Sequence, residues 1–588
     1  MSVAEKPLAD KAAGPLAGKI AGGHLLAKAM ADKGIKKIFS VCGGFINPAF
    51  MGCEHFGIEV IGCRNELEAG FMAAAMARLT REPAVCLAEP SGFTNYVSAV
   101  AEAHYSGDPV IFVSASANTN NFDNAGFKEM PQADVVKCMT KYAIEVNDPQ
   151  RIGWFFDKAY DIAINQPTGP VQLAIPTNFL FSGRVELEQP AGSRKFDTRR
   201  KKVHKPVPNP EDIAELLELT KKARKPVIIA GPGTWFSHAE EELKSFSARY
   251  GIPVFVPVTH LKLYDMSHQA NMGIVDYHQN PCSRLIGEEA DLVLLLGGRL
   301  DFPLNFGAAP LFNTELKMIA VNPTARELSN NMLVDMRICS DVQMFLKALA
   351  AESNAFKVED EWLERVRRRR LESYAELRPL LTSDDQPIHP LRLCYDALMS
   401  LGEDDIIVID GGDVAAWFET AVGLWALEGR KIKGIVSPGP WEQMGTGPAY
   451  ATAAKMTYPG SNVVLVTGDG SLGLAPGLTP LETSIDHNAP VTILVANNAQ
   501  WGMIQAQQKA MWGQVSATSL RDVDYAAVFE GGGAYAETVT APAGIRPAIE
   551  RALKKNESIS ALLDVKTAGV TSPLTQGLVD MRIKTSIE

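Results

Sequence analysis

One pattern recurs along this chain: a short run of apolar, often β-branched residues, then a glycine-containing turn, then a stretch with helical character. It is clearest at residues 36–44, 83–92, 226–233, 292–300, 406–413 and 462–470. Continuous apolar strands separated by helices indicate parallel sheets with both faces covered. We therefore predict an α/β fold of doubly wound parallel sheets, in which ligands bind beyond the carboxyl ends of the strands.

The length of the chain requires several domains. Its 588 residues exceed what one hydrophobic core serves. Two stretches rich in Lys, Arg and Pro, residues 186–212 and 365–390, interrupt the strand and helix pattern. We predict three doubly wound domains, residues 17–185, 205–350 and 380–565, followed by a C-terminal tail or lid, residues 566–588.

Charge and composition exclude several classes of function. A net charge of −11 argues against nucleic-acid binding, which needs concentrated Lys and Arg. Eight scattered cysteines form no C-x-x-C pair, so neither a zinc site nor a disulfide framework is expected. The sequence has no signal-peptide core and no apolar run long enough to span a membrane. These observations predict a soluble, cytoplasmic protein.

One of the glycine turns carries a pattern of oxygen ligands. A buried strand is expected to end at Gly468-Asp469-Gly470, and the next strand at Asn497-Asn498. The 26 residues between Gly470 and Asn497 suit a helical crossover, so Asp469 and Asn498 should project side by side from neighbouring strand ends. A carboxylate and an amide oxygen suit Mg²⁺, whose shell phosphate oxygens often complete. The two glycines would let the backbone approach such a phosphate closely.

This arrangement resembles the signature of the thiamine diphosphate enzyme superfamily, in which GDG is followed at a similar distance by NN. The resemblance implies that thiamine diphosphate and Mg²⁺ are the cofactors. Carried over by position, the metal ligands are Asp469, Asn498 and the main-chain oxygen of Gln500. Gly468 and Gly470 would contact the diphosphate, together with a helix N-terminus expected after Ser471.

The superfamily also has a glutamate that protonates the aminopyrimidine ring of the cofactor. Residues 58–78, IEVIGCRNELEAGFMAAAMAR, resemble the segment that carries it, and Glu66 is the matching residue. Glu68 is a rival by residue type, although the register favours Glu66. Asn65 stands where the family often has His. Without the resemblance, Glu66 could equally be a helix-opening carboxylate that interacts with the helix dipole.

Other residues extend the resemblance along most of the chain. Met444 matches the bulky residue that supports the bent cofactor, although a methionine filling a gap in the core is the alternative. Gly412 and Asp413 match the second turn on the diphosphate side, and Trp501 follows the metal motif in the cofactor pocket.

The resemblance also identifies candidate walls for the reaction pocket. Phe45 lies in a glycine loop that would meet the substrate. Lys128 lies in the segment FKEMPQ, where related families often have Gln or Glu, and its ammonium is predicted to bind a substrate carboxylate or an oxyanion. A surface lysine with no role in the site is the alternative.

The family resemblance carries expectations about cofactors and assembly. Relatives bind ADP or FAD in the central domain, and the turns around residues 227–235 and 294–302 fit such a site. Asn322 stands where a ribose-binding Asp is common, which favours a vestigial site with no nucleotide over a functional one. The pyrimidine-binding N-terminal domain and the diphosphate-binding C-terminal domain of relatives meet across a subunit interface, which implies a homodimer or homotetramer.

The resemblance predicts a lyase or decarboxylase that acts on a 2-oxo acid or a 2-hydroxyacyl or 2-oxoacyl thioester, such as one of CoA, through a ylid and an enamine. This version resembles 2-hydroxyacyl-CoA lyase and oxalyl-CoA decarboxylase. The alternatives are an acetolactate-synthase-like carboligase that uses pyruvate, a flavin oxidase, and a non-catalytic homologue that binds a nucleotide. The last should lack Glu66 or the metal pair, and this chain has both.

Overall fold

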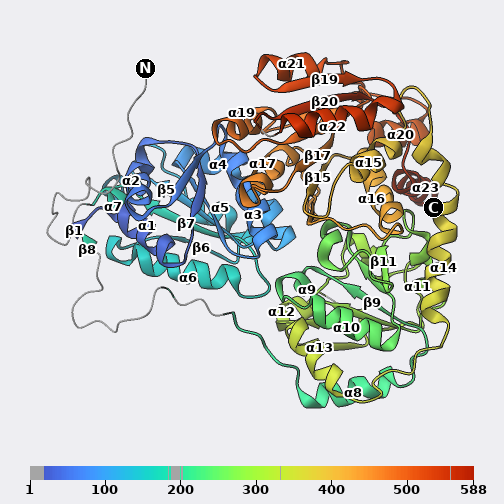
Figure 1. Cartoon of the computed structure of the whole chain (residues 1–588). Helices are drawn as coiled ribbons and strands as arrows, with labels where there is room; N and C mark the ends of the chain where they lie inside the picture. Colours follow the sequence, from blue (N-terminus) through green and yellow to red (C-terminus); the bar gives the residue numbers. More distant parts are fainter. Residues whose placement is uncertain are drawn as a thin grey trace.

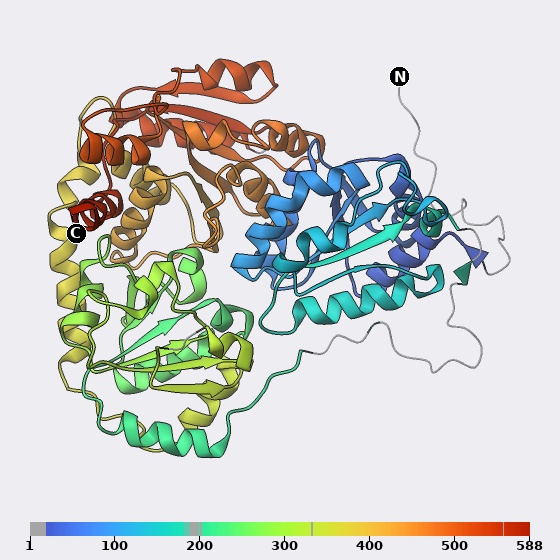
Figure 2. The same ribbon diagram turned by 180° about the vertical axis from the view of Figure 1, so that it is seen from behind.

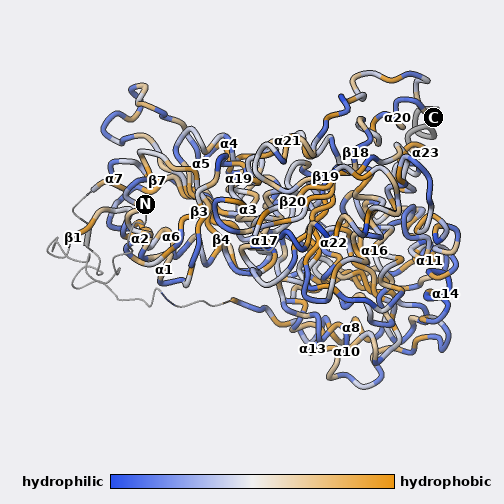
Figure 3. The backbone as a smooth tube through the Cα atoms, turned by 45° about the horizontal axis from the view of Figure 1, so that its top comes forward, coloured by the Kyte–Doolittle hydropathy of each residue, from blue (hydrophilic) through white to orange (hydrophobic). Residues whose placement is uncertain are grey.

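The computed structural model of the protein describes residues 19–182, 185, 186, 199, 203–330, 333–556 and 558–587. Within these residues the chain forms three six-stranded parallel sheets, each flanked by helices, which confirms the predicted α/β fold. Figures 1 and 2 show three lobes, with the N-terminal lobe beside the central and C-terminal ones. Figure 3 shows hydrophobic segments gathered along the strands inside the lobes and hydrophilic segments in many outer loops.

The N-terminal sheet has helices on both faces. Its strands, in spatial order, are β3 (Glu59–Gly62), β2 (Lys37–Ser40), β4 (Ala84–Ala88), β5 (Val110–Ser116), β7 (Val171–Pro176) and β6 (Tyr142–Glu145). One face packs against α1 (Gly22–Asp32), α2 (Asn47–Phe56) and α6 (Ile152–Ile164). The other face packs against α3 (Glu66–Thr80) and α4 (Pro90–Ser106), and this core continues into the C-terminal domain. The two domains of one chain therefore share buried apolar surface.

The C-terminal sheet repeats the strand order of the N-terminal one. Its strands, in spatial order, are β16 (Gly434–Val436), β15 (Ile406–Asp410), β17 (Val463–Gly468), β18 (Thr492–Asn497), β20 (Ala561–Lys566) and β19 (Tyr535–Val539). In both sheets the first strand lies second from one edge, and the chain continues on both sides of it. The direction of winding reverses between β2 and β4 and between β15 and β17, and such switch points are where open α/β sheets bind ligands.

The central sheet has the strand order of dinucleotide-binding folds. Its strands are β11 (Asn271–Ile274), β10 (Val254–Val256), β9 (Pro226–Ala230), β12 (Leu292–Leu296), β13 (Lys317–Asn322) and β14 (Met336–Cys339). The second Lys- and Arg-rich stretch forms most of α14 (Trp362–Ala375), which runs along the outer side of two domains (Figure 1). Arg370 of this helix is buried and donates to the carbonyls of Asn271 and Gly423, so it ties the central domain to the C-terminal one.

Two segments remain: the first Lys- and Arg-rich stretch, which was predicted to separate two domains, and the predicted C-terminal tail or lid. Residues 187–198 and 200–202 of the first Lys- and Arg-rich stretch lie outside the described residues, as do residues 1–18. The C-terminal segment forms helix α23 (Pro573–Ile587), which packs against α16 (Asp413–Ala426) and α20 (Gly502–Trp512). In the part of the chain that the structure describes, no helix is both long and apolar enough to cross a membrane.

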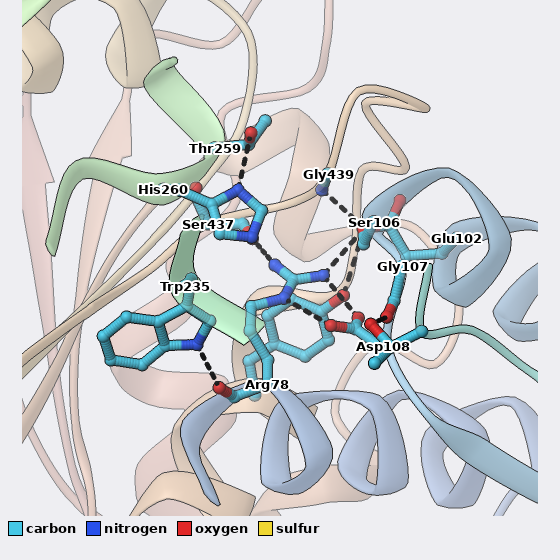
Figure 4. Close-up of polar contacts among 12 residues, drawn as sticks. Arg78, Glu102, Ser106, Gly107, Asp108, Trp235, Thr259, His260, Ser437 and Gly439 are labelled. Atoms are coloured by element: carbon cyan, nitrogen blue, oxygen red, sulfur yellow. Dashed lines mark hydrogen bonds and ion pairs between the residues drawn. The ribbon is translucent and has the colours of Figure 1, made fainter. Parts of the chain in front are cut away.

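The three domains meet at a buried arginine, shown in Figure 4. Arg78, in the last turn of α3, donates to both carboxylate oxygens of Asp108, at 3.1 and 2.7 Å, and to Glu102 at 3.3 Å. Its guanidinium also donates to the carbonyl of Ser437 in the C-terminal domain. The indole of Trp235, in the central domain, donates to the Arg78 carbonyl at 3.0 Å. Arg78 thus contacts all three domains, two through its guanidinium and the central one through its backbone carbonyl.

His260 of the central domain lies beside this cation and is buried. Burial and the nearby Arg78 charge lower the pKa of His260 to about 3. Below pH 6.5 the unfolded chain takes up a proton at this histidine and the folded chain does not, so stability falls as the pH decreases from about 6.5 towards 3. For this group alone we expect a loss of about 2 kcal/mol between pH 7 and pH 5.

Urea unfolding of the wild type and of His260→Gln at both pH values checks this expectation. The variant should lose about 2 kcal/mol less of its unfolding free energy on acidification. His204→Gln, at an exposed histidine, is the matched control and should keep the wild-type dependence. An unchanged pH dependence in His260→Gln would contradict the assignment.

Candidate active site

A cavity opens at the carboxyl edge of the C-terminal sheet, at the switch point between β15 and β17. Its lining includes ten of the residues predicted from sequence to bind the cofactor or the metal: Gly412, Asp413, Met444, Gly468, Asp469, Gly470, Ser471, Asn498, Gln500 and Trp501. They come from four separate segments of the chain. The fold therefore gathers this whole predicted set at the switch point of one sheet.

The oxygen ligands predicted for a cation face this cavity. Asp469 is buried, and its Oδ2 has no hydrogen-bond partner among the described residues. Burial raises the pKa of this carboxyl group to about 6. Asn498 directly follows the neighbouring strand β18. Its amide oxygen accepts from the Gln500 N–H at 3.2 Å, and Ala499 between them has a φ of 53°. A buried carboxylate oxygen without a donor and an amide oxygen thus line the same cavity, and both are ligand types that Mg²⁺ prefers.

The two adjacent asparagines have different surroundings. Asn497 is buried, and its amide donates to Asp564 at 2.9 Å and to the Val523 carbonyl at 3.1 Å. Asn498 lines the cavity. Asn497 thus binds partners within the protein, whereas Asn498 is the asparagine that faces the cavity.

Glycines line part of the cavity, and a buried carboxylate, Asp410, binds the turns next to it. A Cβ at Gly470 would lie only 2.6 Å from the Trp501 ring, so this position takes no side chain. Asp410, at the end of β15, accepts from the Ser471 hydroxyl at 2.6 Å and from the Gly445 and Gly447 N–H groups at 3.0 and 2.9 Å. Burial raises the pKa of Asp410 to about 6.

Two details differ from what the sequence suggested. The helix expected after Ser471 is α18 (Asp469–Leu472), a single turn that begins at Asp469, because the chain turns directly at the strand end. Asp410 was not selected, although it precedes the Gly411-Gly412 turn. Its position as a carboxylate closing an apolar strand was the available signal.

The C-terminal segment closes one side of the cavity. Thr567, Ala568 and Val570 belong to the lining. The Trp417 indole donates to the Val570 carbonyl at 3.1 Å, and the Thr575 hydroxyl donates to Asp413 at 2.6 Å. The predicted tail or lid is therefore held over the cavity by hydrogen bonds, one of which occupies an oxygen of the predicted cofactor residue Asp413.

The loop that carries Met444 is anchored in the N-terminal domain. Glu102 of α4 is buried and accepts from the Gly439 N–H at 2.5 Å. The Ser437 carbonyl, two residues earlier, accepts from Arg78. At the other end of the loop the Gly445 N–H is bound to Asp410. The position of Met444 in the cavity thus depends on the same buried cluster that joins the domains.

The remaining three predicted residues lie at the carboxyl edge of the N-terminal sheet. Glu66 begins α3 and is half-buried; it accepts from the Asn95 amide at 2.8 Å. Among the described residues that line the cavity, none belongs to the N-terminal domain. Glu66, Phe45 and Lys128 are therefore apart from the cavity of their own chain.

The structure separates Glu66 from its rival. Glu68 is fully buried, and burial raises its pKa. The Arg64 N–H donates to its Oε2 at 3.3 Å, and the Thr483 and Thr479 hydroxyls of α19 (Thr479–Asp486) offset part of the rise in its pKa. Glu68 therefore serves the contact between two domains of one chain, whereas Glu66 faces the open edge.

Lys128 lies beside Phe45, as expected of two walls of one pocket, and its ammonium is paired. The Lys128 Nζ is 3.0 Å from Glu89 Oε2 and 5.3 Å from the centre of the Phe45 ring. Glu89 was not among the residues predicted from the sequence. It follows β4 directly, so its position at a strand end was the signal that could have identified it.

A second cleft lies between the N-terminal and central domains, at the turns predicted to bind ADP or FAD. Its lining includes Gly233, Gly297, Arg299 and Asn322. The Asn322 amide donates to the Gly298 carbonyl at 2.9 Å, and Arg299 pairs with Glu327 at 2.6 Å. Asn322 and Arg299 thus already have partners within the protein, and nucleotide binding stays a prediction.

The fold and the cavity define an enzyme of the thiamine-diphosphate-dependent class. Three models of the thiamine pyrophosphate enzyme family match the chain. They are the N-terminal TPP binding domain at residues 20–137, the central domain at residues 213–349 and the C-terminal TPP binding domain at residues 410–565. It belongs to the thiamine pyrophosphate enzyme family, which confirms the family resemblance.

Relatives of three named activities are similar along most of their length. A probable acetolactate synthase from Mycobacterium bovis is 26% identical over 93% of this chain and 95% of its own. 2-Hydroxyacyl-CoA lyase 2 from Danio rerio is 28% identical over 87% of this chain and 85% of its own. Oxalyl-CoA decarboxylase from Escherichia coli K12 is 28% identical over 81% of this chain and 82% of its own.

Proposed function

We propose that the cavity binds thiamine diphosphate through Mg²⁺ and that the enzyme breaks a carbon–carbon bond beside the carbonyl of a 2-oxo acid or of a 2-hydroxyacyl or 2-oxoacyl thioester. The observation that carries the metal assignment is the buried, unpartnered Asp469 oxygen beside Asn498 in a glycine-lined cavity. Calorimetry with Mg²⁺ and thiamine diphosphate tests it: Asp469→Ala should lose metal-dependent cofactor binding. Wild-type affinity in that variant would contradict the assignment.

The residues of the chain divide the work between binding and proton transfer. Asp469, Asn498 and the main-chain oxygen of Gln500 would hold the cation, and Gly468 and Gly470 allow the phosphates to approach. When bound, thiamine diphosphate supplies the electron sink that accepts the electron pair of the broken bond.

The other predicted residues act on the organic part of the cofactor and on the substrate. Met444 would support the bound cofactor, and Trp501 and residues 567–570 would exclude water from the cavity. Glu66 would hold a proton at the aminopyrimidine nitrogen, as a positioned general acid.

We further propose that the active site is completed by a second copy of the chain. Glu66 lies outside its own cavity, and the edge that carries it exposes Phe122 and Phe127, which are 70% and 73% exposed. Exposed apolar side chains beside a functional carboxylate favour a subunit interface. A homodimer would place Glu66 of each subunit at the cavity of the other.

Mixing two inactive variants tests this arrangement. Glu66→Gln and Asp469→Ala homodimers should each be inactive, but a mixed dimer has one site with both residues intact. After random reassociation we expect roughly one quarter of wild-type activity, because half of the dimers are mixed and one of their two sites is complete. A mixture as inactive as its parents would show that the residues do not meet across subunits.

Two substrate classes are supported by the relatives. The leading version is a lyase or decarboxylase of the 2-hydroxyacyl-CoA lyase and oxalyl-CoA decarboxylase type, and the alternative is an acetolactate-synthase-like carboligase. Mass spectrometry of products formed from formyl-CoA with a small aldehyde, and separately from pyruvate, distinguishes them. A 2-hydroxyacyl-CoA product supports the first version and acetolactate the second. A cytoplasmic location stays a prediction.

A further inference from the structure

The N-terminal sheet has a second buried carboxylate at its ligand-binding edge. Glu89 follows β4 directly and is 8% exposed. It precedes helix α4 without capping it, because its side chain turns away from the helix. Its Oε1 accepts from the Phe45 N–H at 2.5 Å and its Oε2 is 3.0 Å from the Lys128 ammonium. Glu89 therefore joins the turn after β2 to the loop after β5, across the switch point of the sheet.

The position of Glu89 relates it to Glu66. Both carboxylates flank the first turns of α4: Glu89 precedes the helix, and Glu66 lies against Gly92 and Asn95 within it. A Cβ at Gly92 would overlap the Glu66 side chain, and a Cβ at Gly43 would overlap Glu89. The glycine loop and the helix are thus closely fitted around two carboxylates at one edge.

Lys128 is held in a restricted geometry by this contact. Its backbone has φ 60°, in the left-handed region that a residue with a side chain rarely adopts. Its Nζ lies 5.3 and 5.4 Å from the rings of Phe45 and Phe127, which pack edge to face. The side chain of Lys128 is 27% exposed and that of Glu89 is 10% exposed, so water screens their attraction only in part.

We propose that the Glu89–Lys128 pair is a charge-neutral specificity element of the reaction pocket. It accepts a substrate whose far end is uncharged and rejects one that carries a carboxylate there, in addition to any carboxylate at the reacting end. The inference rests on the proposed function, because it places this edge beside the substrate. It also revises the expectation that Lys128 binds a substrate carboxylate.

The argument follows from the charges. A substrate carboxylate could bind Lys128 only by displacing Glu89, which would leave a buried carboxylate without its cation. If Glu89 stayed, its negative charge would repel the incoming anion. An ammonium has three N–H donors and the pair uses one, so a carbonyl or hydroxyl oxygen can still be bound without disturbing the pair. The Phe45 and Phe127 rings suit the apolar remainder of such a group.

Two 2-oxo acid analogues of equal length measure this selectivity without turnover. Butanoylphosphonate ends in a methyl group and succinylphosphonate ends in a carboxylate. Calorimetric titration of the enzyme loaded with thiamine diphosphate and Mg²⁺ gives a Kd for each. We expect the wild type to bind succinylphosphonate at least about tenfold more weakly than butanoylphosphonate.

Variants that change the charge of the pair should shift this ratio in opposite directions. Glu89→Gln leaves a net positive wall and should favour succinylphosphonate by about tenfold relative to the wild type. Lys128→Met leaves a net negative wall and should disfavour it further. The double variant is neutral again and should return close to the wild-type ratio. Glu218→Gln, in the exposed Glu218–Lys221 pair of the central domain, is the matched control.

The order of the succinylphosphonate-to-butanoylphosphonate Kd ratios among the variants tests the inference. A ratio that follows the net charge of the pair supports the inference, including the return in the double variant. The same ratio in the wild type and in Glu89→Gln would overturn it and leave the proposed function standing. A wild-type chain that binds no thiamine diphosphate would overturn both.

Discussion

Glu66→Gln should slow the exchange of the cofactor C2 proton by about 10²- to 10⁴-fold, the range expected when a positioned acid or base is lost. The amide keeps the size of the side chain and can still accept from Asn95, so the N-terminal domain should fold normally. It cannot supply the proton that Glu66 is proposed to hold at the aminopyrimidine ring. The measurement is deuterium exchange at C2 of bound thiamine diphosphate, with the reaction quenched in acid and read by NMR.

Glu68→Gln is the control for this experiment, because the two glutamates are two residues apart on the same helix. Glu68 is buried against α19 of its own chain, so its substitution should change the stability of the contact between the two domains. The exchange rate should respond to Glu66→Gln far more than to Glu68→Gln. The opposite ranking would assign the activating carboxylate to Glu68 and would contradict the orientation described above.

Arg78→Leu should lower the free energy of unfolding by about 3–5 kcal/mol, the usual cost of removing one partner of a buried ion pair. Asp108 and Glu102 are both fully buried and would lose the cation that neutralises them. The same change frees the Ser437 carbonyl and so loosens the loop that carries Met444. Affinity for thiamine diphosphate should therefore fall together with stability.

Urea unfolding and cofactor calorimetry separate these two effects. Arg367→Leu, in the exposed Arg367–Glu364 pair on α14, is the matched control and should cost less than about 1 kcal/mol. Adding Asp108→Leu to Arg78→Leu removes one of the stranded carboxylates and should recover part of the stability. If Arg78→Leu were as stable as the control variant, the network would not be what holds the three domains together.

The strands and turns could be predicted because their signals are local. An apolar run such as residues 463–466 is buried on both faces, and the nearby glycines leave the chain free to turn beside a ligand. The placement of Asp469 and Asn498 at one edge of the sheet could also be predicted, because the 26 residues between Gly470 and Asn497 suit a crossover between neighbouring parallel strands. The family comparison then confirmed the class of enzyme that this spacing resembles.

The sequence did not reveal which buried polar groups meet. Glu89, Lys128 and Phe45 come from three separate turns, and nothing in their spacing shows that they share one ion pair and one hydrogen bond. Arg78 and Glu102 likewise look like ordinary helix residues until Ser437 and Gly439 approach them from another domain.

The sequence alone determined the α/β class, the cofactor motif and the helix that begins near Glu66, because periodicity and spacing act over a few turns of chain. Only the tertiary structure decided that Glu66 faces outward while Glu68 is buried, and that Lys128 is neutralised by Glu89. The physical reason is that charge partners are chosen by distance in space, and a buried charge is tolerated only where the fold brings its partner to it.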